Sequence, residues 1–131
     1  MKYADAKKLL GTQVRAWTSM NGQYVGELVE LFGSPWRGKV RITGVLQPAA
    51  VEYARGSRQR RGMRPGDEIE VGGTNVTPID VPGTSYLEAL IEDMNRIAKL
   101  IPNAGPKDEG HLTWTVQQRQ QQIDEERRRG G

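Results

Sequence analysis

KVRITGVL, residues 39–46, is the stretch that decides the fold. Apolar and polar side chains alternate along it without a break, which is typical of a β-strand with one buried face. We expect the inward face to hold Val40, Ile42, Gly44 and Leu46. The outward face then holds Lys39, Arg41, Thr43 and Val45. Because a lone strand is not stable in water, the flanking sequence has to supply partner strands.

A hairpin is expected just before this strand. Asn21-Gly22 is one of the strongest short signals for a tight turn between antiparallel strands. Before the turn, Val14 and Ala16 are expected to face inward, which turns Arg15 and Trp17 outward together. A long second strand then runs over residues 24–32.

The second strand does not keep a simple alternation. If Gly26 and Leu28 face inward, Leu31 does so too only after a slip of one residue near Val29, and without that slip Glu30 would be buried. The sequence therefore predicts a β-bulge and a bent strand.

After residues 47–54, which suit one or two helical turns, comes RGSRQRRGMR, residues 55–64, here called the arginine segment. It contains five arginines and no acid, and it lies in an expected loop over residues 55–66 that ends at Pro65-Gly66. Guanidinium groups are planar donor forks that suit phosphate and carboxylate. The segment therefore predicts an anionic partner.

Two short strands complete the expected sheet. Residues 68–71 read as a strand with Ile69 and Val71 inward, and residues 75–79 follow a glycine-rich turn as a fifth strand. Five short, bent antiparallel strands favour a small closed or nearly closed barrel over residues 12–80.

Residues 12–79 resemble the SH3-like small barrel superfold. The Asn-Gly hairpin, the long bent strand and the terminal hairpin PGDEIEVGGTNVTPI (65–79) carry the likeness. It implies a mainly β fold whose loops and exposed strand faces bind ligands, polynucleotides and peptides among them, but it does not fix the function. A groove for proline-rich peptides is not expected, because residues 19–22 are too short for the acidic, aromatic-rich loop that it needs.

Helices are expected on both sides of the barrel. Residues 1–11 hold a short helix over residues 3–10 that acts as a lid, and residues 84–101 form an amphipathic helix opened by the capping pair Ser85 and Glu88. Its apolar stripe is Leu87, Leu90, Ile91, Met94, Ile97 and Ile101. The stripe either packs on the open side of the barrel or, by its near-heptad spacing, pairs with a second copy of the chain.

The last part, residues 102–131, reads as a linker followed by a polar Gln/Arg tail. The tail is either extended or a marginal helix, because it has almost no apolar stripe. It is also the segment that neighbouring protein subunits would order.

Composition excludes most chemistry. The chain has 131 residues, a formal net charge of +3 and no cysteine, so disulfides, thiolate nucleophiles and cysteine-ligated zinc are excluded. Its one histidine, His111, is expected to be a solvated linker residue rather than a metal ligand, and Asp67, Glu68 and Glu70 belong to a strand rather than to a catalytic site. We expect a non-enzymatic cytoplasmic protein, or part of a particle assembled there, with no cofactor, metal or membrane partner.

Two functions remain. In the first, a nucleic acid is bound by basic and aromatic residues, namely Arg55, Arg58, Arg60, Arg61, Arg64, Arg15, Trp17, Trp36, Arg37, Lys39 and Arg41. The alternative for Trp17 and Trp36 is that they cover a barrel end or pack on the C-terminal helix. In the second function, the chain is a structural subunit of a larger protein assembly, and its arginines pair with acidic protein surface.

Overall fold

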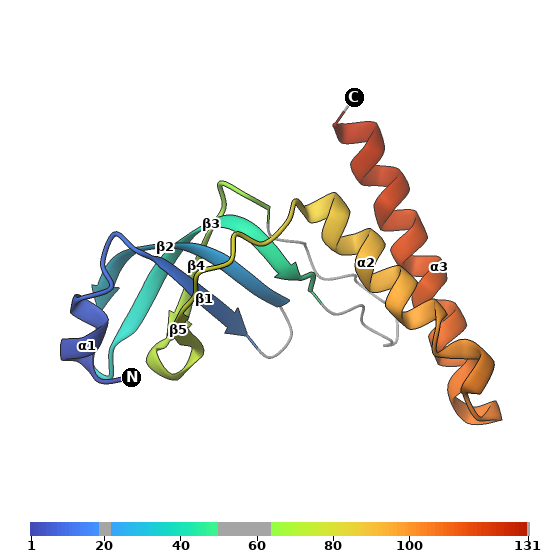
Figure 1. The fold of residues 1–131 in the computed structure, drawn as a ribbon, viewed down its shortest axis with the longest axis horizontal. Helices are drawn as coiled ribbons and strands as arrows, with labels where there is room; N and C mark the ends of the chain where they lie inside the picture. The colour runs from blue at the N-terminus through green and yellow to red at the C-terminus, as the bar shows by residue number, and fades with distance from the viewer. Residues whose placement is uncertain (19–21, 50–63, 131) are drawn as a thin grey trace.

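The computed structural model describes residues 1–18, 22–49 and 64–130. Five strands are followed by a pair of long helices (Figure 1). The elements in chain order are α1 (Tyr3–Lys7), β1 (Gln13–Thr18), β2 (Gly22–Phe32), β3 (Arg37–Gln47), β4 (Glu68–Gly72), the 3-10 turn η1 (Gly73–Asn75), β5 (Val76–Pro78), α2 (Tyr86–Ala98), the 3-10 turn η2 (Ile101–Asn103) and α3 (Pro106–Arg129). The expected helical turns within residues 47–54 fall mostly outside the described residues.

The strands form one antiparallel sheet in the order β4-β3-β2-β1-β5. Four strands follow one another as neighbours, and β5 returns to pair with β1 at the far edge. Within the described residues β4 and β5 do not pair, so the hydrogen-bonded sheet does not close on itself. With α3 alone spanning 24 residues, the fold combines α-helix and β-sheet and is not mainly β as expected.

The predicted hairpin and bulge are both present. Val14 and Ala16 of β1 are fully buried and pair with β2, while residues 19–21 lie outside the described residues. In β2 the register with β3 shifts between Leu28 and Glu30, which leaves Glu30 exposed and Leu31 packed against the core. Two more shifts, near Tyr24 and Gly26, were not predicted and bend the strand further.

The inward face of β3 changes near its end, and there the sequence prediction was wrong. Val45 is buried and Leu46 is half-buried, the reverse of the expected order. The register shift at Gly26 inserts Thr43 as an extra residue, so the alternation restarts after it. Val45 then pairs with Tyr24 on one side and bridges to Thr84 on the other.

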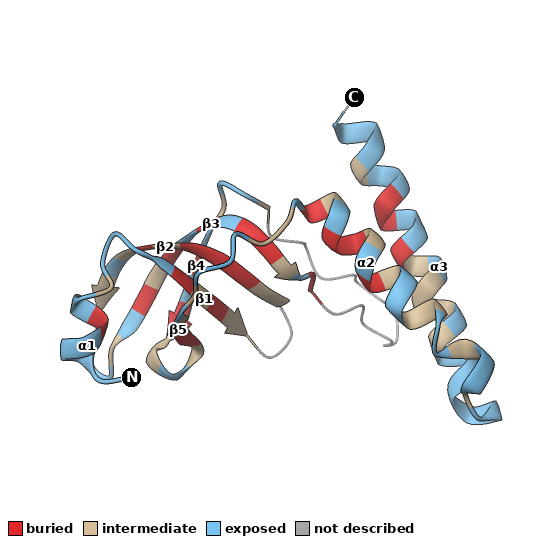
Figure 2. Ribbon diagram, viewed as in Figure 1, coloured by how far each residue is buried: buried red, intermediate tan, exposed pale blue. Residues whose placement is uncertain are grey.

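One hydrophobic core runs from the sheet into the helices (Figure 2). Buried residues from all five strands, such as Leu28 and Ile42, belong to the same cluster as Leu90 of α2 and Ile123 of α3. The chain between β5 and α2 crosses β3 so closely that a Cβ at Gly44 would collide with the Pro82 carbonyl oxygen. The helices are therefore packed on the sheet and not attached as a tail.

The helix α1 and Trp36 cover the opposite end of the sheet. The helix begins at Tyr3 as predicted but ends at Lys7, three residues early. A turn follows, and Gly11, with φ of 79°, leads the chain into β1. Trp36 packs against the core, and its indole N–H donates a 3.1 Å hydrogen bond to the Met1 carbonyl. Trp36 therefore covers an end of the sheet, which is the alternative that was expected beside nucleic-acid binding.

The helices α2 and α3 lie side by side and run antiparallel (Figure 1). The Ser85 hydroxyl caps α2 by accepting a 3.1 Å hydrogen bond from the Glu88 N–H, as expected. The helix ends three residues earlier than predicted, because Pro102 has no N–H to continue it. Of the two states expected for the tail the structure has the helical one, and α3 starts at Pro106, inside the expected linker.

Candidate anionic-partner surface

The arginine segment, the centre of the predicted site, is described only at its last residue. Arg55, Arg58, Arg60 and Arg61 lie outside the described residues, and Arg64 lies inside them. The Arg64 guanidinium donates three hydrogen bonds of 2.7–3.1 Å to the Glu126 carboxylate of α3. It also lies 4.7 Å from the centre of the Tyr86 ring. Arg64 therefore ties the segment to both helices.

The electrostatics of this contact favour the charged forms of both partners. Hydrogen bonding to Arg64 holds the pKa of Glu126 below its ordinary value, and the same bond raises the pKa of Arg64. Burial raises the pKa of the neighbouring Tyr86 hydroxyl. A bidentate pair of this kind is a stable joint at neutral pH.

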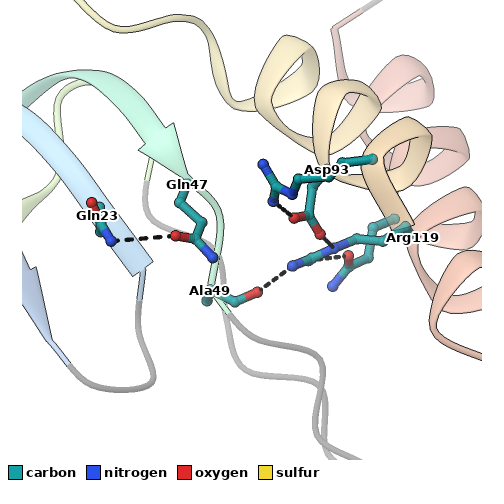
Figure 3. A network of polar contacts seen from close by, with 7 residues as sticks. Gln23, Gln47, Ala49, Asp93 and Arg119 are labelled. Atoms are coloured by element: carbon teal, nitrogen blue, oxygen red, sulfur yellow. Dashed lines mark hydrogen bonds and ion pairs between the residues drawn. The ribbon is translucent and has the colours of Figure 1, made fainter. Parts of the chain in front are cut away.

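A second joint, built on Arg119 of α3, fixes the chain just before the segment (Figure 3). Arg119 is 3% exposed, and its guanidinium donates to the Ala49 carbonyl at 2.8 Å, to Asp93 of α2 at 2.7 Å and to Gln122 at 2.8 Å. Arg96 also pairs with Asp93. The buried charge is thus matched by an acid and by two neutral acceptors.

The two joints lie on one face of α3, since Arg119 and Glu126 are seven residues apart. The contacts on α2 repeat this spacing, because Asp93 and Tyr86 are also seven apart. The described residues on either side of the gap, Ala49 and Arg64, are therefore both held by α3.

Arg15 and Trp17 lie together at the same end of the sheet as Ala49. The Arg15 guanidinium sits 4.9 Å from the centre of the Trp17 ring and donates to the Gln23 side-chain oxygen. Gln23 in turn donates to the Gln47 side chain at 3.3 Å, two residues before Ala49 (Figure 3). These polar contacts connect Trp17 on the outer face of the sheet with Gln47, close to the last described residue before the arginine segment.

The predicted basic face of β3 is not basic in the structure. Arg41 lies between Glu27 and Glu68 in the sheet register. Lys39 lies between Glu30 and Glu70, and its ammonium group is 3.3 Å from the Glu30 carboxylate. Two cations therefore face four acids, which is a cross-strand ladder of opposite charges and not a track for phosphates.

The predicted residues therefore separate into groups. Trp36 and Arg37 lie where β2 ends and β3 begins, whereas Arg15 and Trp17 pair with the first residues of β2. Among the members of the set that the structure describes, the aromatic and basic residues thus do not form one continuous surface.

The stripe expected as a helix interface is used within the chain. Leu90 is fully buried, and Leu87, Ile91 and Met94 pack against the same core, while Ile97 and Ile101 are half-buried. Within the chain the stripe meets α3 and the end of β3, as in the first of the two alternatives expected for it.

Sequence reasoning missed Asp93, Arg119 and Gln122, which are the buried polar residues of the described chain. A signal was present, because Leu112, Val116, Arg119, Ile123 and Glu126 repeat at steps of four and three. Because two of its members are charged, a search for apolar side chains alone does not detect this repeat.

The described residues contain no group of three or more histidine, cysteine or acidic side chains that is placed to hold a metal ion. His111 lies on α3, not in a linker, and its ring stacks at 6.4 Å on that of Trp114. No helix in the described ranges is long and apolar enough to cross a bilayer.

Comparison with known proteins gives a fold and not a family. No protein-family model matches the sequence, and no curated protein matches it significantly. Among solved structures, kinase-associated protein B from Bacillus cereus is similar, with a TM-score of 0.63 and 19% sequence identity. The match covers 88% of this chain and 96% of that one, so it extends beyond the sheet into the helices.

Proposed function

We propose that the chain is a non-enzymatic binding module that contacts an anionic macromolecule through the arginine segment. The observation that carries this proposal is the distribution of charge. The whole chain has a net charge of +3, and residues 50–63 alone contain four arginines against one glutamate, so the described residues are neutral overall. The positive excess is confined to one stretch.

The two joints on α3 support this proposal. Arg119 holds the carbonyl of Ala49, and Glu126 holds the side chain of Arg64. Fixing both ends of a binding segment lowers the entropy lost when it meets its partner. Arg15 and Trp17 adjoin the same end of the sheet and would widen the contact.

A nucleic acid is the first candidate partner. Arg64 is already paired with Glu126, so four arginines remain to neutralise phosphates. With one phosphate each, the slope of log affinity against log salt for duplex DNA is expected to be about −3.6. Fluorescence anisotropy with labelled DNA and RNA across a salt series measures this slope.

The decisive variant replaces Arg55, Arg58, Arg60 and Arg61 by glutamine. Its slope should fall close to zero, whereas replacing the exposed Arg127, Arg128 and Arg129 of α3 should leave the slope unchanged. Salt-insensitive binding, or equal loss in both variants, would reject the nucleic-acid proposal.

A second candidate is a subunit or adaptor that docks on an acidic protein surface. The charge ladder on β3 favours it, because a general nucleic-acid binder usually commits more of its surface to basic residues. The similar solved structure is named as kinase-associated, which describes a protein that accompanies another protein. A pull-down with and without nuclease separates the candidates: a protein partner retained after nuclease treatment supports the second, and its loss supports the first.

We also propose that the sheet belongs to the SH3-like small barrel superfold. Two features support this finer description: residues from all five strands share one core, and β1 contacts β4 although two strands separate them in the sheet order. Both are expected of a sheet that curls around its own core.

A further inference from the structure

A shallow apolar hollow surrounds Trp36. Trp36 is hydrogen-bonded to Met1, and the N-terminus lies at the end of the sheet away from α2 and α3 (Figure 1). One part lies between Met1, Pro35 and the two glycines where β4 passes into η1, Gly72 and Gly73, and the other lies between Tyr3 and Pro35. We call the two parts together the Trp36 groove. It lies apart from the arginine segment and from the function proposed above.

The wall of the groove is fixed. The Trp36 ring lies against Gly73 so closely that a Cβ there would collide with it, and a Cβ added at Gly38 would lie 3.6 Å from the same ring. The indole N–H is held by the Met1 carbonyl. A large aromatic side chain held in this way is a suitable anchor for binding, because it loses little further entropy.

Apolar surface is exposed around this anchor. Met1 is 40% exposed and Tyr3 is 48% exposed, and both line the groove. They are two of the five large apolar residues exposed in the described part of the chain. Grouped apolar exposure beside a hollow marks an interaction surface more often than isolated residues do.

The charges near the groove are mostly positive. Arg37 lines it, and the Lys7 ammonium lies 5.7 Å from the centre of the Tyr3 ring. Lys2 and Lys8 flank α1, and Asp5 is the one acid within that helix. All of these side chains are exposed.

We propose that the Trp36 groove binds a short segment of a partner protein that presents a bulky apolar side chain flanked by acidic residues. The apolar side chain enters beside Trp36, and the acidic residues meet Arg37 and the lysines of α1. Apolar burial supplies the affinity, while the charges at the rim guide the approach. A nucleic acid fits less well, because the indole ring already lies on the backbone of Gly73 and base stacking needs an open aromatic face.

The first test selects peptides from a random displayed library on the full-length protein. Enriched peptides should share a bulky apolar residue with neighbouring Asp or Glu. In two-dimensional NMR spectra their addition should shift the Trp36 indole and the backbone amides of Gly72 and Gly73. Enriched sequences that lack acids, or shifts centred on α2 and α3, would overturn the proposal, as would the absence of any enriched peptide.

Surface variants provide the second test. Tyr3→Ala should weaken binding of a selected peptide at least about tenfold, and Lys7→Glu combined with Arg37→Glu should do the same at low salt. Matched controls at the other end of the molecule are Leu100→Ala and Lys99→Glu, both at exposed positions. Equal effects of the two sets reject the site. Shifts at the same residues that depend on protein concentration alone would assign the groove to a second copy of the chain, and binding of DNA or RNA there would assign it to nucleic acid.

Discussion

Replacing Arg119 by alanine should destabilise the whole molecule. The change removes three hydrogen bonds from a charged donor and leaves the carboxylate of Asp93, which is 5% exposed, without its buried partner. Breaking a buried ion pair by removing one partner costs about 3–5 kcal/mol. Asp93 keeps Arg96, so we expect the lower end, about 3 kcal/mol. For a domain of this size that corresponds to a fall in Tm of about 10 °C.

Urea denaturation followed by circular dichroism measures the loss, with Arg127→Ala as the control. Arg127 is exposed on the same helix, so its replacement should change the free energy of unfolding by less than about 0.5 kcal/mol. A double variant, Arg119→Met with Asp93→Leu, removes both charges and should recover most of the stability. If Arg119→Ala is as mild as Arg127→Ala, Arg119 does not hold α3 to α2 and to the chain after β3, and the reasoning fails.

Three further predictions concern an ion pair, a close backbone contact and a helix cap. Glu126→Gln should lower the free energy of unfolding at pH 7 by about 1 kcal/mol and make stability depend less on pH in the acid range. Because the pKa of Glu126 is lowered in the folded state, its contribution is present above the unfolded pKa and is lost as pH falls through the folded pKa. Urea midpoints that change equally at pH 7 and pH 3 would contradict this. Gly44→Ala should cost about 1–3 kcal/mol because its Cβ meets the Pro82 carbonyl, whereas Gly72→Ala, in open space, should be near neutral in thermal melts. Ser85→Ala should cost about 1 kcal/mol through loss of the cap on α2, and an unchanged melting temperature would show that this hydrogen bond contributes nothing.

The sheet could be predicted from sequence because most strands obey one period. Val14, Ala16, Ile69 and Val71 are buried as their alternation requires. The prediction failed at Val45 for two reasons. A bulge inserts a residue just before it, and Thr84, which is distant in sequence, bridges to it from the other side. The alternation of apolar and polar residues shows which side chains share one face of a strand, but it does not show where another element covers the opposite face.

The helix α3 was the least predictable element, for a different physical reason. Its inner face holds Arg119 and Glu126 where a packed helix usually has apolar residues. Each is tolerated because a distant residue supplies the opposite charge, Asp93 for one and Arg64 for the other. Those pairings are tertiary, so no local reading of the tail could reveal them. The charge ladder on β3 was hidden in the same way, since Glu27 and Glu68 become neighbours of Arg41 only once the register is known.

Val45 is buried by the sheet and by the segment that leads into α2, so the chain cannot be cut between them into two stable fragments. A fragment that ends after β5 would lose Thr84, Tyr86 and Leu90, and would expose apolar surface at the start of β2 and the end of β3. The isolated helix pair would lose the carbonyl of Ala49 that matches the charge of Arg119. Expression of either half alone should therefore give aggregated or unfolded material, and the sheet and the helices should unfold as a single cooperative unit.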